Sequence, residues 1–153
     1  MPKMSGARFL AETLHGYGVS HFFFMPVIVA DAMPEMERLG ITRVMAHSEK
    51  PAVYMADGYA RLGGKPGVCV LISGPGVTNA CTPMGQSFAD SIPVLVISST
   101  TASYSLGKGW GCLHEVTDLE AVTRPLTALS ATARSPDDLE ELIGQAFSIF
   151  ASE

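Results

Sequence analysis

Charged residues are scarce in this chain. Asp, Glu, Lys and Arg together make up 16% of its 153 residues, whereas apolar residues make up 47%. Because so few charges make a lean surface for a soluble monomer, we expect another chain to cover part of that surface. Lys and Arg are scattered singly and the net charge is −5, which excludes the basic stripe that binds nucleic-acid phosphates.

Long apolar runs and disulfide-type cysteine patterns are also missing. No run approaches the ~20 apolar residues of a membrane-spanning helix, and no signal-peptide core follows Met1. These absences predict a cytoplasmic protein that does not enter a membrane. The three cysteines are an odd number, and Cys69 and Cys81 lie in apolar segments, which favours free thiols. No motif places a base beside Cys112, so we interpret it as a loop thiol rather than a nucleophile.

Strand-like and helix-like segments alternate along the chain. Strands are predicted at residues 19–25, 42–46, 67–72 and 93–98, with a further candidate at 126–129, and helices at 5–18, 30–39, 49–61, 76–89 and 135–150. Such alternation favours right-handed crossovers and a parallel sheet between helical layers, which is a three-layer α/β/α architecture. The length suits one domain over residues 1–153, which would bury roughly 70% of the surface of the unfolded chain.

Two motifs lie between these elements. Glu49 precedes the run Met-Ala-Asp-Gly-Tyr-Ala-Arg, so one carboxylate stands at the mouth of a helix rich in small residues. Residues 73–79 read Ser-Gly-Pro-Gly-Val-Thr-Asn, a glycine turn between a strand and a helix. Each motif alone has an ordinary explanation, because acidic residues favour helix starts and glycines favour tight turns.

Together and in this order, the motifs resemble the pyrimidine-binding domain of thiamine diphosphate enzymes, nearest to the acetolactate synthase and benzoylformate decarboxylase branch. The resemblance runs from about Ser5 to Phe150. It implies thiamine diphosphate as cofactor, a 2-oxo acid as substrate, and a lyase or transferase that cleaves or forms a carbon bond beside a carbonyl group. It also implies that Glu49, six residues before Met55, is the catalytic carboxyl group that hydrogen-bonds the pyrimidine ring.

The resemblance assigns further residues to the site. The predicted cofactor contacts are Pro26, Glu49, Ser73, Pro75, Gly76 and Asn79. His114 stands where related synthases have a glutamine that faces the reaction centre, which makes it a second candidate catalytic residue. The alternative is that His114 is an ordinary surface or structural histidine of a loop.

The chain departs from the family pattern at three positions. Ser48 replaces the histidine that usually precedes the glutamate, which puts an auxiliary role for this position in doubt. Phe24 and Val27 replace the glycines of a Gly-x-Pro-Gly segment near the substrate. We therefore expect a reshaped or smaller pocket, unless the phenylalanines belong simply to the core.

The sequence has no Gly-Asp-Gly motif followed by Asn, the family signature for magnesium and diphosphate. The resemblance therefore implies that Mg²⁺ is held by a diphosphate-binding domain of the same parent or of a separate subunit, and that this chain supplies no metal ligand. It also implies a homo-oligomer, a dimer or tetramer, built on the helices of Glu49 and Gly76.

In the family, the last helix leads into one more strand of the same sheet. We therefore expect a fragment or split subunit that has an open sheet edge and is inactive alone. Two alternatives to the enzyme hypothesis stay open. One is a non-catalytic interaction subunit, and the other is a phosphate- or nucleotide-binding α/β module, which lacks support from a third glycine or an acidic ribose-binding residue.

Overall fold

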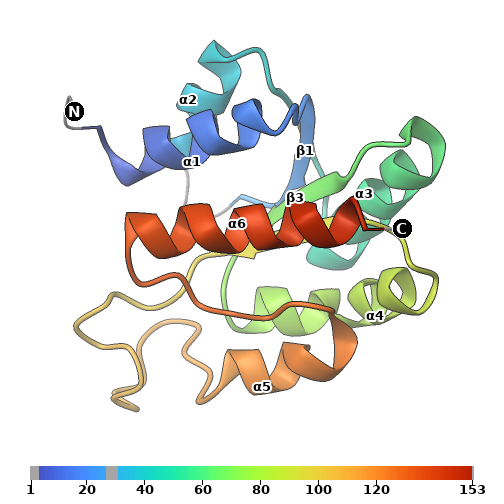
Figure 1. The fold of residues 1–153 in the computed structure, drawn as a ribbon. Coiled ribbons are helices and arrows are strands. Elements are labelled where there is room, and N and C mark those ends of the chain that lie inside the picture. The colour runs from blue at the N-terminus through green and yellow to red at the C-terminus, as the bar shows by residue number, and fades with distance from the viewer. Residues whose placement is uncertain (1–3, 27–30, 153) are drawn as a thin grey trace.

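A four-stranded parallel sheet forms the centre of the computed structural model, which describes residues 4–26 and 31–152. The strand order is β2-β1-β3-β4, and Figure 1 shows β1 and β3 side by side. The strands are β1 His21–Phe24, β2 Thr42–Met45, β3 Gly67–Leu71 and β4 Val94–Ser98. Phe24 lies beside both Met45 and Val70, so the carboxyl ends of the strands meet at one edge. The predicted parallel α/β sheet is confirmed.

Helices cover both faces of this sheet. The helices are α1 Gly6–Gly16, α2 Ala32–Arg38, α3 Glu49–Gly63, α4 Pro75–Ala89, α5 Leu119–Thr123 and α6 Pro136–Phe150. One core cluster joins α1, α2 and α6 to Phe22 and Phe24, and the other joins α3 and α4 to Phe23. Successive strand residues point to opposite faces, so all three phenylalanines are buried and belong to the core, as one of the two hypotheses for them states.

The order of the strands creates a reversal point beside β1. The chain passes from β1 outward to β2, then crosses back over β1 to β3. Because right-handed crossovers place the helices of opposite steps on opposite faces, the loops after β1 and β3 diverge at this point. Open α/β sheets bind their ligands in the crevice that such a reversal leaves at the carboxyl ends of the strands.

The candidate strand at 126–129 is wrong. A 3₁₀ turn, η2, occupies Arg124–Leu126, and residues 127–134 run without regular structure. A strand must pair with a neighbouring strand through backbone hydrogen bonds. This segment instead lines a groove of about 990 Å³ together with β4 and α6. Within the described part of the chain, the outer edge of β4 therefore pairs with no strand. Helix α5, which lies beside α4, was not predicted.

Capping explains where the first and last helices begin. The Ser5 hydroxyl accepts a hydrogen bond from the Arg8 amide at 3.2 Å, as the Ser135 hydroxyl does from Asp138 at 3.1 Å. The Asp138 carboxylate accepts in return from the Arg134 amide at 2.9 Å, which holds the pKa of Asp138 below its usual range. Among residues 4–26 and 31–152, no helix has both the length and the apolar character that crossing a membrane requires.

Helix α3 packs on β3 through a glycine. A Cβ atom on Gly67 would overlap the carbonyl oxygen of Ala56 and lie 2.6 Å from the carbonyl carbon. The helix backbone therefore rests on the strand backbone with no side chain between them. This close approach fixes the middle of α3 against the first residue of β3.

We predict that Gly67→Ala lowers the free energy of unfolding by about 1–3 kcal/mol, because α3 must move away from β3. Gly63→Ala is the matched control, since its Cβ would meet only the Tyr59 ring at 4.0 Å. That helical substitution should raise stability by up to ~1 kcal/mol. Urea unfolding of both variants measures the difference, and equal stabilities would contradict the packing described here.

Candidate functional site

The structure brings three predicted segments to the carboxyl edge of the sheet. Glu49 opens α3 shortly after β2, Ser73 follows β3, and Pro26 follows β1. These positions flank the reversal point of the strand order. Val27, the second large residue of the family departure, lies outside the described residues.

Glu49 meets Asn79 across the starts of two helices. The Asn79 side-chain amide donates a hydrogen bond to Glu49 Oε2 at 3.1 Å. Glu49 is half-buried and is the first residue of α3, where the helix dipole favours a negative charge. Ser48 is the N-cap residue of α3 but makes no capping bond with its side chain. The carboxylate is therefore held from α4 rather than by its own helix turn.

The glycine turn packs closely beside this carboxylate. A Cβ atom on Gly76 would lie 3.5 Å from Glu49 Cγ and 2.5 Å from Ile72 Cγ2. Pro75 occupies the first turn of α4, where its missing N–H costs nothing. Gly76 and Ser73 are buried, whereas Pro75 and Asn79 are exposed. Glycine at position 76 thus lets the start of α4 lie directly against Ile72 and Glu49.

His114 reaches the same turn from a distant loop. Gly74 has φ 59°, and a Cβ atom there would overlap the His114 carbonyl oxygen and lie 2.9 Å from its carbonyl carbon. His114 itself has φ 61°, a left-handed conformation that is uncommon outside glycine, although histidine adopts it more often than most residues. The structure therefore brings His114 against the Ser73–Gly76 turn, although 40 positions separate it from Gly74 in the chain.

The loop around His114 is tied by its neighbour Glu115. The Glu115 carboxylate accepts hydrogen bonds from the backbone amides of Gly109 and Cys112, each at 2.9 Å. Charge-assisted bonds of this kind are stronger than neutral ones. Glu115 belongs to the same family-like segment as His114, but its bonds to loop amides were not predicted, because such contacts leave no periodic signal in the sequence.

Two buried polar atoms lack a partner. In residues 4–26 and 31–152, the buried side-chain atoms with no hydrogen bond are Ser99 Oγ and His114 Nδ1. An unpaired buried polar atom is costly unless a water or ligand satisfies it. Ser99 directly follows β4 and so also lies at the carboxyl edge of the sheet. Sequence analysis did not single out Ser99, although its place at the end of a predicted strand was a usable signal.

The charge of Glu49 affects a thiol in the buried core. Burial raises the pKa of the Cys69 thiol on β3, and the nearby Glu49 carboxylate raises it further. Cys69 is therefore held as a neutral thiol, in agreement with its interpretation as a core residue. Burial also raises the pKa of Cys81.

No group of three or more potential metal ligands occurs among the residues that the structure describes.

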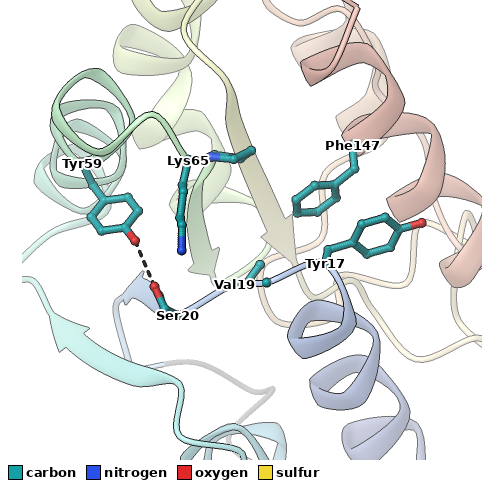
Figure 2. Close-up of a pocket in the computed structure, with 8 residues that line it drawn as sticks. Tyr17, Val19, Ser20, Tyr59, Lys65 and Phe147 are labelled. Carbon is teal, nitrogen blue, oxygen red and sulfur yellow. Dashed lines mark hydrogen bonds between the residues drawn. The ribbon is translucent and has the colours of Figure 1, made fainter.

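A small cavity of about 130 Å³ lies at the opposite edge of the sheet, beside the start of β1. Figure 2 shows the Tyr59 hydroxyl group pointing toward Ser20, with which it shares a hydrogen bond of 3.0 Å. Tyr17 and Phe147 stack with their ring centroids 4.4 Å apart on the other side of the cavity. This cavity contains none of the predicted site residues.

These contacts fit a flat heteroaromatic ring with a nitrogen acceptor. The Glu49 carboxyl group lies beside the Ser73–Gly76 turn and can hydrogen-bond a ring nitrogen. His114 Nδ1 adds a polar atom that has no partner of its own. The residues present therefore suit the pyrimidine part of the cofactor that the sequence motifs imply.

We predict that Gly74→Ala displaces the His114 loop, because the added methyl group takes the space of the His114 carbonyl oxygen. The imidazole resonances of His114 in NMR spectra should move relative to those of the unmodified chain. Gly111→Ala is the control: it carries the same positive-φ strain in the same loop, but its Cβ would meet no atom within 4 Å. If both variants shift His114 equally, strain rather than contact explains the effect.

A family model described as "Thiamine pyrophosphate enzyme, N-terminal TPP binding domain" matches residues 4–122. The chain is 50% identical over 151 residues to a probable 2-ketoarginine decarboxylase of Pseudomonas aeruginosa, a match that covers 98% of this chain and 27% of that protein.

Acetolactate synthases are also similar to this chain. The large subunit from Haemophilus influenzae is 34% identical over 151 residues, covering 97% of this chain and 26% of that protein. An acetolactate synthase of Arthrospira platensis is 34% identical over 155 residues, covering 98% of this chain and 26% of that protein. The chain thus spans about a quarter of the length of these relatives.

Proposed function

Because this chain belongs to the thiamine pyrophosphate enzyme family as an N-terminal TPP binding domain, we propose that it binds the pyrimidine half of thiamine diphosphate in an enzyme acting on 2-oxo acids. The observation that carries this proposal is the meeting of Glu49, Asn79 and Gly76 at the starts of α3 and α4. A carboxyl group, an amide and a bare backbone turn converge there from two motifs.

Glu49 is the proposed catalytic residue. When bound, thiamine diphosphate supplies a nucleophilic carbon that allows bonds beside a carbonyl group to be cleaved or formed. Glu49 exchanges a proton with the pyrimidine nitrogen, and its half-buried position strengthens that hydrogen bond. Asn79 keeps the carboxylate aimed at the ring. Ser73, Pro75 and Gly76 form the surface on which the ring lies.

His114 is the proposed second catalytic residue, and Pro26 borders the cofactor from the end of β1. The His114 imidazole can carry a proton to or from the substrate carbonyl group. Its Nδ1 atom is buried without a partner, so a bound group at the Ser73–Gly76 turn would satisfy it. The hydrogen bonds of Glu115 hold the loop that presents it.

We propose decarboxylation rather than carboligation as the reaction. The identity to the probable 2-ketoarginine decarboxylase is 50%, against 34% to the acetolactate synthases, over almost the same residues. The proposed substrate is accordingly a 2-oxo acid with a guanidino side chain. Mg²⁺ and the diphosphate group are bound by a diphosphate-binding domain of the same parent or of a separate subunit, in a cytoplasmic homo-oligomer.

The proposal is tested in a chimera. This chain replaces the matching N-terminal 27% of the Pseudomonas aeruginosa relative, and carbon dioxide release from 2-ketoarginine and from pyruvate is measured. Glu49→Gln should lower the rate by about 10²–10⁴, because the amide cannot exchange the proton. Glu140→Gln, an exposed change on α6, is the control. An active chimera that is indifferent to Glu49→Gln contradicts the proposal, and one that assembles but releases no carbon dioxide favours the interaction subunit.

His114→Ala in the same chimera should lower kcat about 10²-fold with a smaller change in KM, since a proton relay acts in the transition state. His47→Ala removes an exposed histidine near Glu49 and should change neither constant. Equal effects of the two substitutions would assign His114 a structural role.

A further inference from the structure

Asp57 is a buried carboxylate that the proposed chemistry does not use. Its residue is 6% exposed and lies on α3, two turns beyond Glu49. It accepts hydrogen bonds from Arg61 Nε at 2.6 Å and from Ser87 Oγ at 2.8 Å. Arg61 also donates to Asp90 Oδ2 at 2.6 Å, just beyond the end of α4. A charged network thus joins the far ends of α3 and α4.

This network repeats the spacing of the candidate site. Glu49 pairs with Asn79 and Asp57 pairs with Ser87, and both pairs are 30 residues apart in the chain. Eight residues separate the two pairs on each helix, which corresponds to ~12 Å of rise. Because α3 and α4 both run away from the carboxyl edge of the sheet, a slide of one helix on the other would break both pairs together.

Several of the buried residues between the two pairs are small. Between the pairs, the buried residues are Ala52, Val53 and Ala56 of α3 and Ala80, Pro83 and Met84 of α4. Small side chains let helices approach closely, but they offer shallow ridges that resist sliding weakly. A directional bond to a buried charge is a known way to specify register. The Ser87 hydroxyl group has an alternative acceptor in the backbone carbonyl oxygen of Pro83 at 2.9 Å, but the charged Asp57 carboxylate is the stronger acceptor.

We propose that Asp57, Arg61 and Ser87 form a register lock that places Glu49 opposite Asn79. They are positioning residues, and their importance for activity rests on the proposed function of Glu49. The surroundings support this assignment. Ser87 is 3% exposed, so its hydroxyl bond is shielded from water, and Arg61 holds the pKa of Asp90 below its usual range.

The test uses the 153-residue chain without cofactor. Ser87→Ala should let α3 slide on α4, so the side-chain amide protons of Asn79 should exchange with water about fivefold faster in NMR measurements. Arg61→Ala removes the partly exposed member of the register lock and should also speed the exchange of the Asn79 side-chain amide protons. This variant provides the test if Ser87→Ala does not fold. Ser105→Ala is the matched control, since Ser105 is also buried and donates only to Ala102 within its loop.

Unchanged Asn79 exchange in the folded Ser87→Ala and Arg61→Ala variants overturns the register lock, as does an equal change in Ser105→Ala. Faster exchange in the two lock variants alone supports it. Because the measurement contains no cofactor and no substrate, its result is independent of whether Glu49 activates thiamine diphosphate. The chimera assay of Glu49→Gln decides that separate question.

Discussion

The parallel contact between α3 and α4 is the constraint on which the rest of the site depends. Both helices begin at the carboxyl edge of the sheet, so their positive ends and their first side chains lie together. Glu49 and Asn79 can share a hydrogen bond only because the helices run in the same direction at matching heights. The small residues between them make that closeness possible.

Missing side chains shape the site as much as present ones do. Gly67 lets the backbone of α3 rest on β3, Gly76 lets the start of α4 pack against Glu49, and Gly74 receives the carbonyl group of His114. Each glycine is a point where two segments distant in the chain come within contact distance. A methyl group at any of them would separate parts that the proposed chemistry needs together. Close backbone approach therefore holds the parts of the candidate site together.

Much of the architecture was predictable because its signals are local. Ser135 and Pro136 mark the start of α6, and the apolar runs at 67–72 and 93–98 mark buried parallel strands. The strand prediction at 126–129 was wrong, since a short apolar run resembles a strand whether or not a neighbour is present to pair with it. Short α5 was missed because its five residues show no helical period.

Taken alone, the sequence determined the alternation of strands and helices, the two motifs around Glu49 and Ser73, and the family resemblance that the family model later confirmed. These properties follow from residue type and spacing along the chain. Only the tertiary structure decided that Asn79 holds Glu49, that His114 lies on Gly74, and that Asp57 pairs with Ser87. Those contacts join residues 30 or more positions apart, and such distances become contacts only when helices pack on a common sheet.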